Sequence, residues 1–233
     1  MRLHRFYIDK PISEEMFDIT DRDLVHQWRN VFRYNVGSQA VLFDGSGTDY
    51  LCIIRSLRNL GATVSVINKI ENKNVPKINL WLCLGIIKKD NFELVIQKVT
   101  ELGVSHIVPV LCDRSEKKNI NMERLKKITI EASEQSGRGD IPEIHQVADF
   151  SEILEQKILP REKIALHLNS RYIGDFLSDK NLKEWAVFIG PEGGWSDDEL
   201  KDFALHNIPQ VSLGPQILRS ETAAIAVTSL LLL

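Results

Sequence analysis

The amino-acid sequence predicts an α/β protein with a mostly parallel sheet, preceded by a small antiparallel sheet or barrel. Two observations carry this prediction. Residues 36–67 contain short β-rich runs separated by Gly, Asp and Asn turn signals at close spacing, which is typical of a small antiparallel sheet. From residue 78 onward, apolar runs of strand length alternate with helical segments, which favours a parallel sheet with helices packed on it.

These patterns divide the chain of 233 residues into an N-terminal domain over residues 1–70 and a C-terminal domain over residues 78–233. Between them, "NKIENKNVPK" (68–77) is polar, carries a proline and shows no apolar periodicity. A linker is therefore expected at 71–77.

The C-terminal domain begins with "INLWLCLG" (78–85), a nearly continuous apolar run expected of a strand covered on both faces. A helix is expected over 90–103, where apolar residues recur at helical spacing, Asp90 can cap and Gly103 can terminate. The remaining elements alternate in the same way. Strands are expected at 104–110, 163–168, 185–190 and 210–214, and helices at 121–136, 196–206 and 220–233.

The composition is that of an ordinary globular protein, with 43% hydrophobic residues, 26% charged residues and a net charge of −3. No apolar run approaches the ~20 residues of a membrane span, and the N-terminus shows no signal-peptide pattern, so a cytoplasmic protein without a membrane partner is expected. Cys52, Cys83 and Cys112 are isolated and are expected to be reduced core residues. The histidines show no ligand spacing, so no metal is expected, and His106 and His167 are interpreted as strand-end residues.

The stretch "FIGPEGGWSDDEL" (188–200) places a glycine-rich turn between a strand and a helix, as phosphate-binding loops do. It lacks the lysine of a P-loop and the GxGxxG spacing of a dinucleotide site. Ser196 and Glu199 fit a capping box, while Asp197 and Asp198 already place negative charge at the helix N-terminus. A cationic or neutral ligand is therefore expected at this loop rather than a phosphate.

Two other strand ends carry comparable turns, in "ALHLNSR" (165–171) and "VSLGPQILRSETAA" (211–224). Gly190 and Gly214 allow the backbone to approach a ligand closely. If the three strands are neighbours in the sheet, their loops enclose one ligand largely through main-chain contacts. The alternative interpretation is that these are ordinary turns between strands and helices.

The glycine loop and "LGPQILRSETAA" together resemble the family of ribosomal RNA small subunit methyltransferase E, in the SPOUT superfamily. The resemblance continues through "KKDNFELVIQKVTELGVSHIVPV", "EASEQSGRGDIPEI", "RFYI" and "VFRYNVGSQAVLFDGSG", and so covers nearly the whole chain. Members of this family methylate N3 of a uridine in 16S ribosomal RNA, using S-adenosylmethionine. The resemblance implies a trefoil knot in the C-terminal domain, a PUA-like RNA-binding barrel at the N-terminus, and a homodimer with each active site near the subunit interface.

The resemblance also implies which residues hold S-adenosylmethionine. The cofactor is expected against the three loops, with its adenine in an apolar slot and hydrogen-bonded to the backbone. The implied cofactor-binding residues are Leu166, His167, Leu168, Gly190, Pro191, Glu192, Gly194, Leu213, Gly214, Ile217, Leu218 and Thr222. The sequence leaves open whether Glu192 faces the sulfonium or braces its loop.

Two ionisable residues at the start of the last helix, Arg219 and Glu221, are the candidate catalytic residues. N3 of uridine bears a proton at neutral pH, so a base must remove it or a cation must stabilise the resulting anion. Arg219 could bind a uracil carbonyl oxygen or a phosphate, and Glu221 could act as the base or orient Arg219. Charge matching at a helix N-terminus accounts for Glu221 equally well.

The resemblance implies that the RNA partner is 16S ribosomal RNA, free or in the assembled small subunit. N3 is accessible only in an unpaired or flipped-out base. Acidic residues are in excess in the last third of the chain, so basic residues further upstream are the candidate phosphate contacts. They are Arg2, Arg5, Arg33, Lys88, Lys89 and Arg138. Family members often carry arginine where this chain has Gln216 and Gly139, and each change removes a potential phosphate contact. The alternatives are another RNA target, such as a ribose 2′-hydroxyl, and a non-catalytic RNA-binding role.

Overall fold

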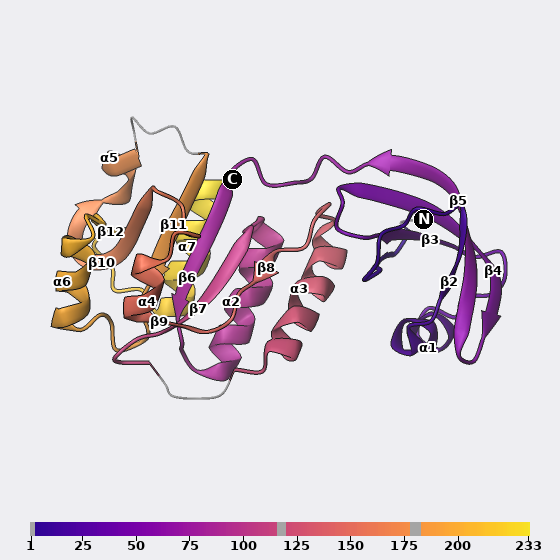
Figure 1. The fold of residues 1–233 in the computed structure, drawn as a ribbon, viewed down its shortest axis with the longest axis horizontal. Coiled ribbons are helices and arrows are strands. Elements are labelled where there is room, and N and C mark those ends of the chain that lie inside the picture. Colours follow the sequence, from indigo (N-terminus) through magenta and orange to yellow (C-terminus); the bar gives the residue numbers. More distant parts are fainter. Residues whose placement is uncertain (1–2, 116–119, 178–182) are drawn as a thin grey trace. The chain divides into compact units, whose positions relative to one another are not determined.

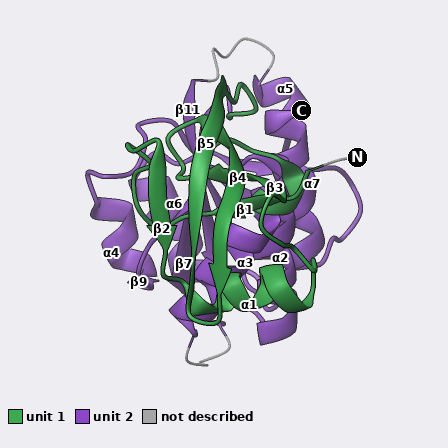
Figure 2. Ribbon diagram, turned by 90° about the vertical axis from the view of Figure 1, so that its right-hand side faces the viewer, with its two compact units in different colours: residues 1–75, 133–140 green, residues 76–132, 141–233 purple. Residues whose placement is uncertain are grey.

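A computed structural model describes residues 3–115, 120–177 and 183–233 of the chain. The chain forms two compact units, shown in different colours in Figure 2. The first unit comprises residues 1–75 and 133–140, and the second comprises residues 76–132 and 141–233. Among the helices described, none has both the length and the hydropathy that crossing a membrane requires.

The first unit is built on a five-stranded sheet with the strand order β1-β3-β4-β5-β2. Its strands are β1 (Arg5–Tyr7), β2 (Met16–Ile19), β3 (Gln39–Phe43), β4 (Thr48–Arg58) and β5 (Gly61–Glu71). All neighbours are antiparallel except β1 and β3. The expected β-rich runs form β3, β4 and β5, but β5 continues to Glu71, so residues 68–71 pair with β4 instead of starting a linker.

One helix, α1 (Arg22–Asn30), covers this sheet, and the side chain of Asp21 caps it by accepting hydrogen bonds from the next turn. Trp28 is fully buried in the core of the unit against Phe6. The segment 133–140 joins the unit through its backbone, because the Gly139 N–H donates to the Asn74 carbonyl at 2.9 Å. This segment lies far along the sequence from the rest of the unit, and only long-range hydrogen bonds place it there.

The second unit is an α/β domain with a seven-stranded parallel sheet (Figure 1). Its strand order is β12-β10-β11-β6-β7-β8, with β9 also paired to β7. The strands are β6 (Asn79–Gly85), β7 (His106–Leu111), β8 (Glu143–Ile144), β9 (Ala148–Asp149), β10 (Lys163–Tyr172), β11 (Glu184–Ile189) and β12 (Gln210–Ser212). The helices are α2 (Lys89–Leu102), α3 (Met122–Ser136), α4 (Phe150–Glu155), α5 (Ile173–Leu177), α6 (Asp197–Leu205) and α7 (Ser220–Leu232). The last residues of α3, 133–136, belong to the first unit. The α/β alternation and the mostly parallel sheet predicted from the sequence are confirmed.

Strand β6 shows why its sequence is apolar throughout. Leu80, Leu82 and Leu84 point into one core with residues of α2, α3 and α7, while Trp81 and Cys83 point into the other with residues of α4 and α6. Successive side chains of a strand face opposite sides, so a strand covered on both faces has no polar positions.

The ends of two helices test the predicted caps. Gly103 terminates α2 with φ of +103°, in the left-handed region that glycine adopts most easily. The expectation for Asp90 was wrong, because α2 begins at Lys89 and Asp90 lies within its first turn, while the cap residue Lys88 makes no side-chain hydrogen bond. The capping box of Ser196 and Glu199 at α6 is confirmed, with both of its hydrogen bonds present.

Candidate functional site

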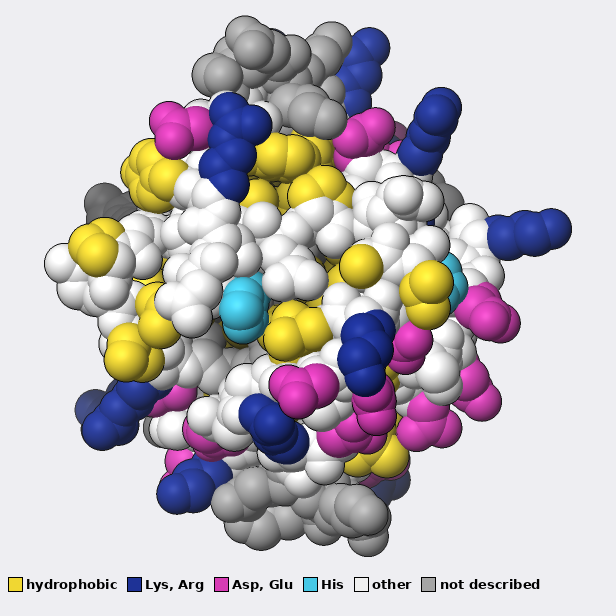
Figure 3. Space-filling model, turned by 90° about the vertical axis from the view of Figure 1, so that its left-hand side faces the viewer, with side chains coloured by type: hydrophobic (Ala, Val, Ile, Leu, Met, Phe, Trp, Pro, Cys, Tyr) yellow, Lys and Arg dark blue, Asp and Glu magenta, His cyan; other side chains and the backbone are white. Residues whose placement is uncertain are grey.

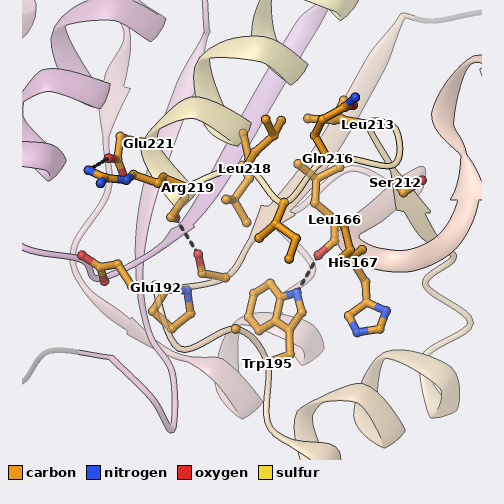
Figure 4. Close-up of a pocket in the computed structure, with 18 of the residues that line it drawn as sticks. Leu166, His167, Glu192, Trp195, Ser212, Leu213, Gln216, Leu218, Arg219 and Glu221 are labelled. Carbon is orange, nitrogen blue, oxygen red and sulfur yellow. Dashed lines mark hydrogen bonds and ion pairs between the residues drawn. The ribbon is translucent and has the colours of Figure 1, made fainter.

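A cavity of about 690 Å³ lies at the carboxyl ends of three strands of the second unit. These strands, β12, β10 and β11, are consecutive in the sheet, as the sequence interpretation required. The loops that follow β11 and β12 contribute to the wall, together with residues 166–168 within β10 and the first turn of α7 (Figure 4). Because parallel strands end at the same edge of a sheet, three segments distant in sequence converge on one site.

The wall from β10 is formed where that strand leaves its pairing with β12. The two strands pair at Leu166 and again at Arg171, and the register shifts between these residues. The indole Nε1 of Trp195 donates to the carbonyl oxygen of Leu166 at 2.9 Å, which holds the end of the paired segment (Figure 4). The displaced backbone presents His167 and Leu168 to the cavity.

The loop after β11 is a tight turn over residues 190–194. The Gly194 N–H donates to the Pro191 carbonyl at 2.9 Å, and Gly194 has φ of +68°. The Ser220 hydroxyl donates to the Gly190 carbonyl at 2.6 Å and so joins this turn to α7. On its other side the turn packs against β6, where a Cβ on Gly85 would lie 2.8 Å from Pro191.

Glu192 braces this turn. Its Oε1 accepts a hydrogen bond from the backbone N–H of Lys88, the residue that precedes α2, at 3.1 Å. On the opposite side of the turn, Nη1 of Arg114 donates to the Gly193 carbonyl at 2.9 Å. The turn is therefore held from two sides, and the carboxylate of Glu192 has a structural role in addition to lining the cavity.

The acidic stretch after the turn forms the N-terminus of α6 and its cap. Ser196 Oγ accepts from the Glu199 N–H at 3.2 Å and donates to Oδ2 of Asp113 at 2.6 Å. The buried Glu199 carboxylate accepts from the backbone N–H groups of Ser196 and Asp113, at 2.7 and 2.9 Å. The Ser196 hydroxyl and the Glu199 carboxylate thus occupy donors at the start of α6, and the acidic first turn disfavours a phosphate, which agrees with a cationic or neutral ligand.

Apolar side chains form part of the cavity wall. The side chains of Leu168, Ile217 and Leu218 line it while remaining 40%, 84% and 38% exposed. Gly214, with φ of +138°, lets the chain turn from β12 into this wall. Exposed apolar side chains in a concave site are typical of contact with an apolar part of a ligand or a partner.

Arg219 and Glu221 lie at the start of α7, on the rim of the cavity (Figure 4). The side chain of Arg219 is 85% exposed, and its Nη1 lies 3.9 Å from Oε1 of Glu221. Glu221 is 9% exposed, and its Oε2 is buried without a hydrogen-bond partner among the described residues. A buried carboxylate oxygen without a partner is costly unless a proton or a ligand satisfies it.

The cavity brings together all but one of the residues expected to hold a cofactor. Thr222 does not line it, because this residue is exposed on α7 beyond the rim. Sequence reasoning missed Trp195, Ser220 and Arg114. Trp195 and Ser220 adjoin the two motifs, which was an available signal, whereas Arg114 reaches the turn from a distant segment.

Two arginines expected to contact RNA are instead paired inside the first unit. Arg138 is 3% exposed, and its Nε and Nη2 donate to the two carboxylate oxygens of Asp140, both at 2.9 Å. Arg5 makes a similar double contact with Asp49, at 3.2 and 2.7 Å, and stacks on the ring of Phe43. Guanidinium groups engaged in this way hold the unit together instead of presenting charge to a phosphate.

The other basic candidates remain at the surface. Arg33 in the first unit and Lys88 and Lys89 in the second are exposed, and Lys88 also lines the cavity. Arg2 lies outside the described residues. Figure 3, which views the side that carries α6, shows basic, acidic and hydrophobic side chains intermixed among the described residues. The described residues of this face therefore form no broad basic field of the kind that dominates RNA-binding surfaces.

Comparison with known proteins agrees with this geometry. Residues 73–232 match the family model of an RNA methyltransferase domain. A ribosomal RNA small subunit methyltransferase E of Rickettsia conorii is 31% identical, over 97% of this chain and 93% of the relative.

Two solved structures superpose on nearly the whole chain. A ribosomal RNA small subunit methyltransferase E of Neisseria gonorrhoeae, bound to S-adenosylmethionine, has a TM-score of 0.88 and 28% identity, covering 98% of this chain and 96% of that one. A methyltransferase of Legionella pneumophila, in complex with the same cofactor, has a TM-score of 0.90 and 29% identity, covering 99% and 97%. The chain therefore belongs to the family of ribosomal RNA small subunit methyltransferase E.

Proposed function

We propose that this protein transfers a methyl group from S-adenosylmethionine to N3 of a uridine in 16S ribosomal RNA of the small subunit. The observation that carries the proposal is the buried, unpartnered Oε2 of Glu221 on the rim of the cavity. Relatives in the family are named as methyltransferases of small-subunit ribosomal RNA, and two structural neighbours contain the cofactor. A proton acceptor beside a cofactor-sized cavity is what methylation of a protonated ring nitrogen requires.

The residues present fit S-adenosylmethionine. A cavity of about 690 Å³ lies within the range of roughly 300–1,000 Å³ typical of small-molecule sites. Its apolar wall of Leu168, Ile217 and Leu218 suits an adenine ring, and the carboxylates of Glu192 and Glu221 suit a ligand with a positive sulfonium. The loops over 166–168, 190–194 and 213–218 would hold the cofactor through backbone groups.

In the proposed mechanism, bound S-adenosylmethionine supplies an electrophilic methyl group. The loops exclude water and align the reactants, and alignment alone contributes several kcal/mol to such a displacement, on the order of 7 or more. Glu221 accepts the N3 proton of the uridine through Oε2. Arg219, whose side chain is 85% exposed on the rim, binds a carbonyl oxygen of the uracil or the adjoining phosphate.

The first unit, residues 1–75 and 133–140, supports the proposal that the N-terminal part of the chain is a PUA-like RNA-binding domain, with the second unit as the methyltransferase domain. Its compact five-stranded sheet has the size of such a module. Arg33, Lys88 and Lys89 are the proposed phosphate contacts, because they are exposed and basic.

We further propose a trefoil knot in the second unit and assembly as a homodimer. Strand β12 lies at the edge of the sheet beside β10, whereas α7, which follows it in the chain, packs near α2. This arrangement supports a chain path that passes through an earlier loop. Ile217, at 84% exposure beside the cavity, supports a partner surface there. Sedimentation analysis of the purified protein tests the dimer directly, and a monomer at micromolar concentration would contradict it.

The test of the activity uses small subunits from a strain that lacks the enzyme. Incubation with the protein and S-adenosylmethionine, followed by nucleoside mass spectrometry, is expected to give 3-methyluridine. A 2′-O-methylated nucleoside would overturn the assignment of the target, and calorimetry showing no binding of S-adenosylmethionine would favour a non-catalytic role. Free 16S ribosomal RNA, assayed in parallel, distinguishes the two forms of the substrate.

A further inference from the structure

Three potential metal ligands gather in the second unit outside the cavity: His106, Glu143 and His145. We propose that these residues bind a divalent transition-metal ion, with Zn²⁺ as the preferred ion. Each residue offers one ligand atom, and all three atoms lie within 4.8 Å of one another. Two imidazoles and a carboxylate form a donor set that suits Zn²⁺, which is bound by histidine nitrogen and carboxylate oxygen.

The backbone places these side chains in one row. His106 begins β7 and pairs with Glu143, the first residue of β8, in parallel register. His145 follows two residues after Glu143, so both side chains leave the chain on the same face. The His145 N–H donates to the Ile107 carbonyl at 2.9 Å, which continues the pairing just past β8. The donor atoms are thus carried by paired strand segments, which position ligands more firmly than a free loop.

Two of the three distances between donor atoms are close to those around a tetrahedral ion. Nδ1 of His106 lies 3.2 Å from Nε2 of His145 and 3.4 Å from Oε2 of Glu143. Bonds of about 2.0–2.2 Å at tetrahedral angles place neighbouring donors roughly 3.3–3.5 Å apart. With three protein ligands, the fourth position is open to water or to an added ligand, as in zinc sites of the three-ligand type.

The surroundings hold the two imidazoles in place and leave the cluster open to an ion. Trp81, opposite His106 in β6, stacks on the rings of both histidines at centroid distances of 3.8 and 4.7 Å. The Glu143 side chain is 64% exposed, which leaves a path for an ion to enter.

The position of the cluster separates it from the proposed methyl transfer. His106 and Glu143 begin their strands, whereas the cavity lies at the carboxyl ends of β10, β11 and β12. In a parallel sheet these are opposite edges. A bound ion would therefore clamp the segment after β8 to β7, and the inference goes beyond the proposed function.

Zinc binding to the chelator-treated full-length protein tests this inference, using competition with a chromophoric chelator. We expect one Zn²⁺ per chain for the wild type. His106→Ala and His145→Ala are expected to bind at least 100-fold more weakly, and Glu143→Gln at least tenfold more weakly. His206→Ala, which removes an exposed histidine at the end of α6 in the same unit, is the matched control and should bind as the wild type does.

A second measurement uses Trp81 as a reporter. Cu²⁺ is expected to quench part of the tryptophan fluorescence of the wild type at one equivalent, and Trp81→Phe should remove that part. If circular dichroism shows that an alanine variant does not fold, the zinc affinity of Glu143→Gln tests the proposal instead. The Glu143 side chain is exposed, so this change leaves the core intact. Absence of stoichiometric Zn²⁺ binding to the wild type, or unchanged binding by folded Glu143→Gln and by the His106→Ala/His145→Ala double variant, would overturn the proposal.

Discussion

At Glu221, one carboxylate oxygen is buried without a partner while the other lies 3.9 Å from the guanidinium of Arg219. If Oε2 accepts the N3 proton, Glu221→Gln removes the base but keeps the shape of the site. We expect the dissociation constant of S-adenosylmethionine, measured by calorimetry, to stay unchanged and kcat to fall by roughly 100-fold or more. Asp197→Asn, in the exposed first turn of α6, should change neither value. Turnover of Glu221→Gln at the wild-type rate would remove the assignment.

Arg138 illustrates how a residue that looks functional in the sequence can be structural. Its guanidinium is buried and donates two hydrogen bonds to the carboxylate of Asp140. Arg138→Ala therefore leaves the Asp140 carboxylate without this partner. We expect this change to lower the free energy of unfolding of the first unit by about 3 kcal/mol, measured by urea denaturation. By contrast, Lys89→Ala should weaken RNA binding with a stability change within about 0.5 kcal/mol. A stable Arg138→Ala protein with weakened RNA binding would restore the original interpretation.

At the scale of elements, the cavity depends on how Trp195, just before α6, is hydrogen-bonded to Leu166 within β10. Trp195→Phe keeps an aromatic ring against Phe150 and Phe203 but loses the hydrogen bond from Nε1 to the Leu166 carbonyl. A lost hydrogen bond costs about 1 kcal/mol, and we expect the affinity for S-adenosylmethionine to fall by roughly five- to tenfold.

The control for this change is Trp28→Phe in the first unit, which removes an equally buried indole far from the loops in sequence. It should lower stability without changing the cofactor affinity. Equal losses of affinity in both variants would indicate general destabilisation instead of a local effect on the cavity wall.

The elements of the second unit were predictable because their signals are local. The continuous apolar run at β6, the helical spacing before Gly103 and the capping box at Ser196 each depend on residues within a few positions of one another. The short elements β8, β9, α4 and α5 carry no such signal and were missed. The extension of β5 to Glu71 was also missed, because pairing with β4 overrides the polar composition of that segment.

At the scale of the whole molecule, the three cysteines report on the two units separately. Cys52 is buried in the first unit, and Cys83 and Cys112 are buried in the second. Burial raises the pKa of Cys52 and of Cys112 to about 12, so their thiolates are rare in the folded protein. Alkylation should therefore require unfolding of the unit that contains each thiol.

Cofactor binding then becomes measurable through thiol protection. At a concentration 100 times its dissociation constant, a ligand that binds only the folded state raises the free energy of unfolding by about 2.7 kcal/mol. The population of opened molecules then falls roughly 100-fold. Because the cavity belongs to the second unit, we expect S-adenosylmethionine to slow alkylation of Cys83 and Cys112 by that factor and to leave Cys52 unchanged, as followed by peptide mass spectrometry. Protection of Cys52 alone would indicate that the cofactor binds the first unit, and it would contradict the proposed site.

The sequence by itself determined the alternation of strands and helices, the glycine turn after β11 and the acidic cap of α6, because backbone geometry and capping follow from neighbouring residues. The turn expected within residues 165–171 was wrong, because β10 continues to Tyr172. Only the tertiary structure decided that β12, β10 and β11 are adjacent, that Arg138 is buried against Asp140, and that one oxygen of Glu221 has no partner. It also brought His106 and His145 together, 39 residues apart in the chain. The physical reason is that burial and strand order arise from long-range pairing, and no local pattern of residues specifies which distant segment will cover or complete a site.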